Sequence, residues 1–502
     1  MSGRSRVEWV LLALLPCALA VWGAQLLVAF SLIPQVDMNA SRVVPSVALA
    51  KGYDIYAGPT DGPVIDFMYG PVGALAFLPA ALAGTPSGAL LIAGLLNVLL
   101  FFAPIAWLHL GVRAVSRPIA LAGLATFALL AALDGGLSFS AFTIHVDAPA
   151  LALCATAAGL VIFRSPGAGH RRLMPSAACA ALAVWTKQTM LPIVVALPLW
   201  LLITDGPRAA RRHVVWTAAF GAGLAVLFVA WFGYDAMRFN MVTLPRLQPW
   251  YGEAEGHGRL PAALTSLRLL LTANRGPAML LGVVAAVAVR DGGGARDWWR
   301  AQPWTLLLLV GLLMVPMSVL GGAKLGGYLN THSPTNYFVL GAATLGLSRL
   351  AGRRPSGPMA MLLAALLCLL VGRYVLDAHS GPLLQGALAR LRAWSDNPQQ
   401  QAYEFARQHP GEAYFPWNPL APLQANGVLF HSEIGMWNRE LTGVEPTPEH
   451  VRRFLPPDAR IVASRPPTSN LSRLPPANHH LPQYSRLVTE PGLEGWEVRA
   501  RE

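Results

Sequence analysis

The chain has 502 residues, of which 54% are hydrophobic and 13% are charged, and its formal net charge is +12. A soluble domain carries roughly 25% charged residues, so the composition excludes an ordinary soluble protein. The positive charge does not indicate a nucleic-acid partner, because the arginines lie in short clusters between apolar runs, where they set the orientation of a membrane protein.

Long apolar runs recur along most of the chain and indicate a polytopic helical membrane protein. The segment 69–84 is apolar but short, and we interpret it as a half-helix beside the membrane. With this choice the arginine-rich connectors fall on the same face as the N-terminus, which is the cytoplasmic face by the positive-inside rule. The sequence then predicts eleven spans, near 9–33, 88–112, 118–136, 147–163, 173–186, 188–204, 213–233, 276–290, 303–320, 336–350 and 357–377.

Residues 378–502, called the tail below, are rich in proline, histidine and charge and contain no spanning run. QQQAYEFARQHPGEAYFPWNP predicts a helix, a turn and a strand, and PDARIVASRPP and GLEGWEVRARE predict short strands. We therefore expect an all-α multi-pass protein of the cell membrane, with a transmembrane domain over 1–377. Its N-terminus is cytoplasmic, and the tail forms a small extracytoplasmic α/β domain.

Two aspartates are placed at the edge of the predicted membrane region. Asp37 follows the first span, in the outer loop 34–68 that also holds Asp54, and Asp147 begins the span 147–163. A carboxylate at bilayer depth is costly, so such acids tend to be functional or interfacial. On the predicted topology both acids face the outer side. Simple capping of a helix N-terminus is the alternative role for Asp147.

Lysine is rare: the 38 basic residues include three lysines, among them Lys187 and Lys324. Lys187 interrupts a long apolar run in AVWTKQTMLP, and the predicted topology places it at an outer turn near Asp147; snorkelling is the alternative. GGAKLGGYLNTHSPTNY joins flexible glycines to Lys324, His332 and Asn336. Such a loop can hold a phosphate through backbone N–H groups and a cation, or it is a plain connector.

The remaining loops and the missing motifs narrow the chemistry. Arg246, Trp250 and Glu253 lie in loop 234–275, whose mixture of aromatic and charged residues is typical of sugar sites. His431 and Glu433 in the tail are too few for a metal site. The sequence contains no P-loop and no dinucleotide fingerprint after a strand. Any activated donor is therefore expected to arrive through the membrane.

In combination, these features resemble the GT-C membrane glycosyltransferases, which include protein O-mannosyltransferases (glycosyltransferase family 39) and the bacterial aminoarabinose transferases of lipid A. The resemblance covers roughly residues 9–350. It rests on Asp37, on GYDIYAGPTDGPVIDFMYGP, on VDAPALAL and on the lysine in WTKQT. Family members carry one acid in the first outer loop, matched by Asp37, and a second near the fourth span, matched by Asp147. Where many have lysine–proline–proline, this chain has Met68-Tyr69-Gly70-Pro71.

The resemblance implies an integral-membrane glycosyltransferase that moves a hexose or pentose from a polyprenyl-phosphate donor to an extracytoplasmic lipid, glycan or protein, with inversion at C1. It implies Asp37 and Asp147 as catalytic residues, with Asp37 as the base. The other implied contacts are Lys187, Lys324, Arg246, His332, Asn336 and Tyr69 for the donor phosphate, and Asp54, Trp250 and Glu253 for acceptor or sugar. No tandem D-x-D or D-E pair follows the first span, so no metal site is predicted, and a weakly bound divalent cation is left open.

Two other classes of protein compete with this interpretation. A transporter or flippase of lipid-linked saccharides usually shows charged residues at the membrane midplane and an internal repeat, whereas here the charges gather at one face and no repeat is visible. A non-catalytic membrane assembly protein, in which the tail is the active part, is the third class. The expected partners are the lipid-linked donor and membrane lipid; no nucleic acid and no protein partner is indicated.

Overall fold

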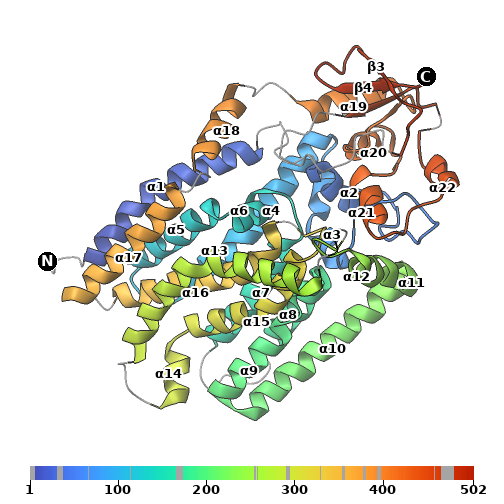
Figure 1. Cartoon of the computed structure of the whole chain (residues 1–502). Coiled ribbons are helices and arrows are strands. Elements are labelled where there is room, and N and C mark those ends of the chain that lie inside the picture. The colour runs from blue at the N-terminus through green and yellow to red at the C-terminus, as the bar shows by residue number, and fades with distance from the viewer. Residues whose placement is uncertain are drawn as a thin grey trace.

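Helices dominate the computed structural model of the chain (Figure 1). It describes residues 6–30, 38–65, 67–112, 115–164, 173–253, 256, 258–289, 294–327, 329–352, 357–376, 380–392, 397–456, 458–464 and 480–502. Before the tail the α-helices are α1 (Arg6–Phe30), α2 (Met38–Ala50), α3 (Pro71–Ala76), α4 (Pro86–Gly111), α5 (Arg117–Leu133), α6 (Gly135–Phe142), α7 (Asp147–Ile162), α8 (Met174–Thr186), α9 (Ile193–Asp205), α10 (Pro207–Phe232), α11 (Tyr234–Arg238), α12 (Leu244–Leu247), α13 (Arg259–Ala288), α14 (Ala295–Ala301), α15 (Trp304–Gly322), α16 (Ser333–Gly352) and α17 (Gly357–Leu376).

Several helices are long and apolar enough to cross a membrane, so the chain is a multi-pass membrane protein. Within the described residues six helices meet both criteria, or seven if the bent pair α5 and α6 counts as one span. Three further apolar helices are shorter, at Asp147–Ile162, Met174–Thr186 and Met361–Arg373. The predicted number of eleven spans therefore stays a prediction.

The continuous span expected over 118–136 is broken in the structure. α5 ends at Leu133, α6 begins at Gly135, and the two helices meet at 99°. Asp134 explains the break, because its carboxylate accepts a hydrogen bond from the backbone N–H of Leu137 at 2.8 Å and so caps α6. The bend directs α6 and the turn after it toward the start of α7.

The predicted half-helix 69–84 is two short pieces, α3 and the 3₁₀ helix Leu78–Leu82, rather than a span. The preceding loop 34–68 contains a helix, α2, which the sequence analysis treats as loop. α2 is buried along most of its length, with Val43, Val44 and Val47 in a core that also includes Phe77 of the apolar segment, and this packing stabilises the helix.

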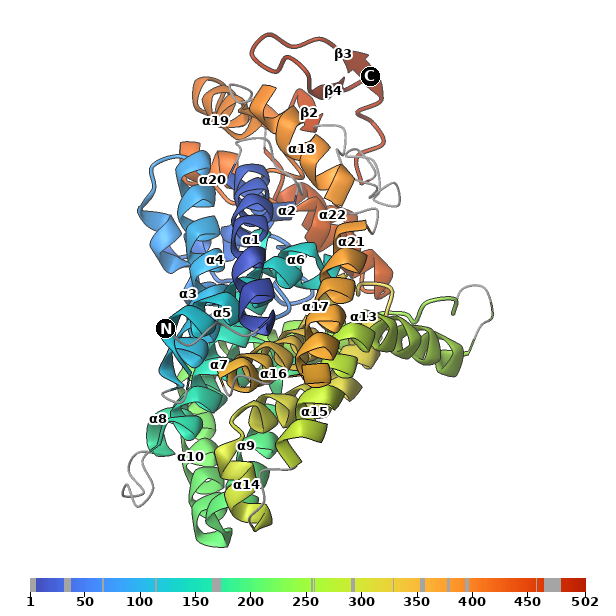
Figure 2. The ribbon, with the colours of Figure 1, turned by 90° about the vertical axis from the view of Figure 1, so that its left-hand side faces the viewer.

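The tail forms its own small sheet with helices around it, as the predicted helix, turn and strands anticipate. The strand order is β1-β2-β4-β3, with β1 and β2 parallel and the other pairs antiparallel. In Figures 1 and 2 the tail lies at one end of the helical bundle, opposite α14 and the connection of α9 to α10. Its elements are α18 (Ser380–Arg392), α19 (Pro398–Gln408), β1 (Ala413–Tyr414), α20 (Leu420–Asn426), α21 (Glu433–Leu441), α22 (Pro448–Arg453), β2 (Ile461–Ser464), β3 (Arg486–Val488) and β4 (Glu497–Ala500).

Hydrogen bonds to backbone groups join the tail to the connection between α2 and α3. The N–H of Val64 donates to Nδ1 of His431 at 2.8 Å, and the N–H of Ser432 donates to the carbonyl of Val64 at 2.9 Å. Nε2 of His450 donates to the carbonyl of Gly62 at 2.7 Å. Both histidines are buried, so water does not compete for these bonds.

Arg439 on α21 makes a second set of contacts with the same connection. Its guanidinium donates to the carbonyls of Gly58 and Pro59 at 3.0 and 3.2 Å and lies over the ring of Phe239 at 4.6 Å. Burial lowers the pKa of Arg439 to about 10, so the side chain is still charged at neutral pH. These contacts fix α21 against the membrane helices.

Candidate active site

A cavity of about 710 Å³ lies between the membrane helices and the tail. Its lining comes from α2, the 67–69 loop, α3, the α6–α7 turn, the α8–α9 break, the α12 region, the end of α15 with the loop after it, and α21. Among the described lining residues there are three strong cations, Arg42, Lys187 and Lys324, and no carboxylate. The described lining therefore suits an anionic ligand.

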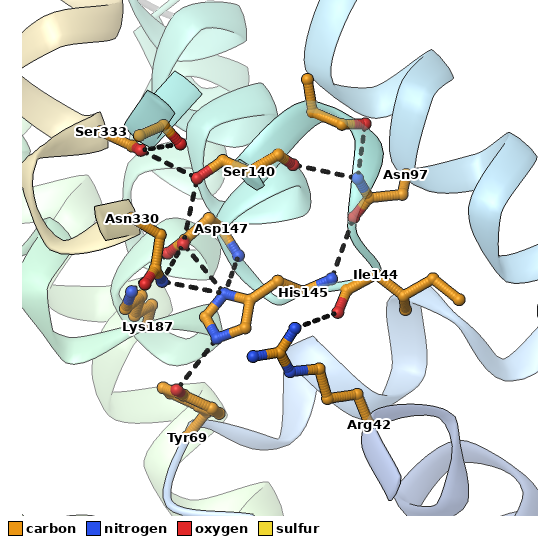
Figure 3. Close-up of polar contacts among 12 residues, drawn as sticks. Arg42, Tyr69, Asn97, Ser140, Ile144, His145, Asp147, Lys187, Asn330 and Ser333 are labelled. Carbon is orange, nitrogen blue, oxygen red and sulfur yellow. Dashed lines mark hydrogen bonds and ion pairs between the residues drawn. The ribbon is translucent and has the colours of Figure 1, made fainter. Parts of the chain in front are cut away.

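Asp147 lies behind the cavity wall at the centre of a polar network (Figure 3). Its side chain is fully buried and forms an ion pair with Lys187. The amide of Asn330 donates to Oδ2 at 2.6 Å and the hydroxyl of Ser140 donates to the same oxygen at 3.3 Å. The carboxylate is enclosed by these partners and does not line the cavity.

His145 connects this carboxylate to the cavity. Its Nδ1 lies 2.9 Å from Oδ2 of Asp147 and 3.3 Å from the backbone N–H of the same residue. Its Nε2 forms a hydrogen bond with the hydroxyl of Tyr69, 3.1 Å away. Asp147, His145 and Tyr69 thus form a chain of hydrogen bonds, and two of its members, His145 and Tyr69, line the cavity.

Local packing explains why these side chains converge. The side-chain oxygen of Asn97 on α4 accepts from the N–H of His145 at 3.1 Å, and its amide donates to the carbonyls of Ser140 and Ala141. The turn between α6 and α7 is therefore held in place by a third helix, α4. On the other side the N–H of Gly70 donates to the carbonyl of Thr186 at 3.2 Å.

Gly70 is required at this close approach. A Cβ atom there would lie 1.8 Å from the carbonyl oxygen of Trp185, which no side chain tolerates. The contact sets Tyr69 beside the end of α8, where the backbone becomes extended at Lys187. The ammonium of Lys187 lies 5.7 Å from the centre of the Tyr69 ring. The predicted proximity of Lys187 to Asp147 is confirmed.

Arg42 on α2 is a cavity residue that the sequence analysis does not single out. Its guanidinium lies 5.0 Å from the centre of the Phe139 ring and donates weakly to the carbonyl of Ile144, at 3.5 Å. Figure 3 shows the guanidinium of Arg42 beside His145, and both residues line the cavity. α2 thus brings a planar cation close to His145.

Lys324 and Arg246, both expected near the donor phosphate, have different surroundings. The ammonium of Lys324 lines the cavity and donates to the carbonyls of Pro245 and Arg246 at 2.6 and 3.2 Å, at the end of α12. Burial lowers the pKa of Lys324. Arg246 is exposed and does not line the cavity, so only its backbone belongs to the site.

His332 and Asn336 point away from the cavity. Nε2 of His332 lies 3.0 Å from the hydroxyl of Ser266 on α13. Asn336 is buried in α16, where it accepts from the amide of Asn274 at 2.7 Å and donates to Asp134 at 3.5 Å. The structure places both in the packing between helices; Asn330 and Thr331 of the same loop line the cavity instead.

The expected acceptor or sugar residues lie outside the cavity as well. Asp54 is exposed. Glu253 is exposed, accepts from the N–H of Trp250 at 2.9 Å and pairs with Arg259 at 3.7 Å. The Trp250 ring packs under the same arginine at 5.7 Å. Asp37 lies outside the described residues, although its neighbour Met38 lines the cavity.

Two solved structures share this architecture over nearly the whole chain. ArnT from Cupriavidus metallidurans bound to undecaprenyl phosphate aligns with a TM-score of 0.54 at 14% identity, covering 97% of each chain. The same protein in its apo state aligns with a TM-score of 0.53 at 13% identity, also over 97% of each chain. The chain has the ArnT fold.

The ArnT-like fold confirms the resemblance to GT-C glycosyltransferases at the level of architecture. The archaeal oligosaccharyltransferase AglB from Archaeoglobus fulgidus aligns more weakly, with a TM-score of 0.41 at 13% identity over 89% of this chain and 69% of AglB. No family model and no curated protein sequence matches the chain. The fold is therefore visible from the structure where sequence comparison finds nothing.

The described residues of this ArnT-like fold do not fit a divalent cation. They contain no group of three or more His, Cys, Asp or Glu side chains that could hold one, and the one acid in the network, Asp147, is already paired with Lys187. A cation-rich lining would repel a metal ion. We therefore derive no step through a metal.

Sequence reasoning finds Asp147, Lys187 and Tyr69. It assigns no role to His145, which it leaves open between ligand, base and structural residue, and it misses Arg42 and Asn330. His145 adjoins VDAPALAL, and a lone histidine before a span carries no specific signal. Arg42 lies in a stretch read as loop, and Asn330 is one polar residue among several in its connector. No periodic signal marks Arg42, because residues 43–48 of α2 are all buried rather than spaced along one face.

Proposed function

We propose that the chain is a membrane glycosyltransferase that transfers a sugar from a polyprenyl-phosphate donor to an extracytoplasmic acceptor. The observation that carries the proposal is the cation-rich cavity with its Asp147–His145–Tyr69 chain in an ArnT-like fold. The ArnT structure is bound to undecaprenyl phosphate, a lipid of the kind a polyprenyl-phosphate donor leaves behind. On this proposal the cavity and the tail face the outside of the cell membrane and the N-terminus is cytoplasmic.

The proposed reaction is an inverting displacement at C1 of the donor sugar. The acceptor oxygen forms a bond to C1 as the bond from C1 to the phosphate oxygen breaks, and the polyprenyl phosphate leaves with the bonding electrons. The acceptor proton passes to a carboxylate, for which we propose Asp37, because it adjoins the cavity residue Met38 in sequence. General bases of this kind act within about 3 Å of the proton they remove.

Cations in the cavity stabilise the charge that grows on the leaving phosphate. Arg42 and Lys324 are the candidates, since Lys187 is engaged by Asp147. Fixed positive groups aimed at a developing charge in a water-poor site typically give a large part of a rate enhancement. Asp147 holds Lys187 and His145 in position, and through His145 it orients the Tyr69 hydroxyl.

Reconstitution of the full chain in liposomes tests the proposal. Liposomes containing a polyprenyl-phosphate sugar and an acceptor extract of cell envelopes should release polyprenyl phosphate and form a labelled glycoconjugate. A matched pair of variants controls for general loss of charge: Lys324→Met removes a cavity cation, whereas Lys51→Met removes an exposed one. Movement of intact donor between leaflets with no cleavage would instead favour the transporter.

A further inference from the structure

The tail supplies one whole side of the cavity through helix α21. Four residues of this helix, Ile434, Trp437, Asn438 and Leu441, line the cavity. They are spaced at i, i+3, i+4 and i+7, so they form one face of the helix. The opposite side of α21 carries Arg439, which fixes the helix to the carbonyls at 58 and 59.

Trp437 differs from its neighbours on this helix. Residues 431–436, 438 and 439 are buried, whereas Trp437 is partly exposed. Its ring packs at the edge of a tail core that includes Tyr414 and Phe430. Trp437 lines the cavity, and its indole N–H has no hydrogen-bond partner among the described residues.

Two further neutral polar groups of the cavity lining have no partner among the described residues. The hydroxyl of Thr189 is buried without a hydrogen bond. The amide of Gln248 lines the cavity next to Gly326 and makes no hydrogen bond in the described chain. In contrast, the amide of Gln188 is occupied by the carbonyls of Met68 and Met241.

We propose that the α21 face is the acceptor side of the cavity and binds a sugar ring on the indole of Trp437. This inference rests on the proposed function and adds the chemical class of the acceptor, a carbohydrate. A pyranose or furanose has a face of C–H groups and a rim of hydroxyls. The C–H face packs on an aromatic plane, and the hydroxyls bond to polar groups such as the indole N–H of Trp437 and the side-chain amide of Gln248.

The charges around this face disfavour other acceptors. A lysine or other amine would meet Arg42 and Lys324 with no carboxylate among the described lining residues. A purely apolar ligand would bury the side-chain amide of Gln248 without a partner, which costs about 1–3 kcal/mol. A neutral polyhydroxyl ring satisfies both conditions.

The test uses the full chain in lipid nanodiscs free of glycoside detergents. Saturation-transfer NMR is recorded with methyl glycosides of glucose, galactose, mannose and arabinose. We expect contact signals for at least one glycoside, reduced by about tenfold in Trp437→Ala, the order of a tryptophan truncation at a binding centre, and largely retained in Trp437→Phe. Trp231→Ala is the matched control, because Trp231 is 51% exposed on α10 and does not line the cavity.

A second measurement separates this inference from the proposed function. Addition of undecaprenyl phosphate should raise the thermal midpoint of the wild type and of Trp437→Ala equally. No shift in the wild type would overturn the proposed function. If the thermal midpoint does shift, three results would overturn the carbohydrate site and leave the donor site standing. The first is glycoside signals that survive in Trp437→Ala, and the second is no glycoside signal at all. The third is a contact signal only from a serine-containing peptide measured in the same way.

Discussion

The hydroxyl of Tyr69 lies 3.1 Å from Nε2 of His145, although 76 positions separate the two residues in the chain. The pair forms where the loop before α3 and the turn before α7 meet. Because His145 is held on its other nitrogen by Asp147, the direction of the Tyr69 hydroxyl is set by a carboxylate that the cavity does not reach. The buried carboxylate of Asp147 therefore fixes, through His145, the orientation of the Tyr69 hydroxyl in the cavity lining.

Replacing Tyr69 with Phe should reduce transfer without unfolding the protein. The ring keeps its packing against Phe67 and His145, and the hydrogen bond between the hydroxyl and Nε2 is lost. The net value of such a hydrogen bond is about 0.5–1.5 kcal/mol, so the rate should fall roughly three- to tenfold. The measurement is release of polyprenyl phosphate at limiting donor. Tyr234→Phe, at an exposed tyrosine, should match the wild type; equal rates for both variants would remove Tyr69 from the site.

Lys187→Met should destabilise the protein because it leaves Asp147 buried without its cation. Breaking one partner of a buried ion pair typically costs about 3–5 kcal/mol. The double variant Lys187→Met/Asp147→Asn should recover most of the thermal stability, since a neutral amide tolerates burial here beside Asn330 and Ser140. Thermal unfolding in nanodiscs measures the cycle. Additive losses in the double variant would contradict the coupling.

Asp37→Asn should leave the protein inserted and folded but remove most activity, if Asp37 is the base. Loss of a general base typically lowers the rate by about 10²–10⁴. The matched control is Asp54→Asn, an exposed acid in the connection after α2. Initial rates with saturating donor give the comparison, and near-normal turnover of Asp37→Asn would transfer the role of base to another group.

Arg439→Met should loosen the tail from the membrane helices. The variant keeps an apolar stem but loses the hydrogen bonds to the carbonyls of Gly58 and Pro59. Bonds from a charged donor contribute about 1.5–3 kcal/mol, so amides of the 58–64 segment should exchange with deuterium about tenfold faster or more. Arg452→Met, at an exposed arginine of α22, should leave this exchange unchanged. The prediction fails if both variants protect the segment equally.

The contact between His431 and Val64 should weaken in acid. Burial lowers the pKa of His431 to about 4 from its usual 6.5, and its Nδ1 must stay unprotonated to accept from the Val64 N–H. An opened tail binds the proton below pH 6.5 and the docked tail does not. The contribution of His431 to stability is therefore full above about pH 6.5 and falls as the pH drops toward 4, by about 1.4 kcal/mol per pKa unit.

Glu433 acts in the opposite direction, so matched variants are needed to separate the two groups. Burial, followed by the charge of Glu440, raises the pKa of Glu433 to about 8 from 4.5. Its contribution to stability is present below pH 4.5 and is lost as the pH rises toward 8. Hydrogen exchange of the tail from pH 4.5 to 8 should lose its acid sensitivity in His431→Asn and its alkaline sensitivity in Glu433→Gln. Unchanged pH profiles in both variants would contradict these assignments.

The sequence predicts those features that depend on local composition. The apolar runs, the helix, turn and strand at 399–418, and the interruption at Lys187 all reflect nearest-neighbour patterns of hydrophobicity and helix breaking. The closeness of Lys187 to Asp147 follows from the topology, because both lie at the same end of adjacent helices.

Other features depend on contacts between distant segments, which a single sequence does not encode in a readable form. The capping of α6 by Asp134 turns a predicted straight span through 99°. Asn336 and His332 belong to a segment with the composition of a phosphate loop. In the structure they lie near the start of α16 and form hydrogen bonds with α13 instead. Trp437 lies 400 residues downstream of α2 and reaches the same cavity only because the tail docks.

The long separation between the two sides of the tail contact has a consequence for biogenesis. Val64 and His431 are 367 positions apart, so a ribosome adding roughly 5–20 residues per second needs on the order of 20–70 seconds between them. During that interval Val64 lacks its partners in the tail and the cavity lacks its α21 side. The cavity is therefore completed only when the last quarter of the chain has been made, and a prematurely terminated product cannot form it in full.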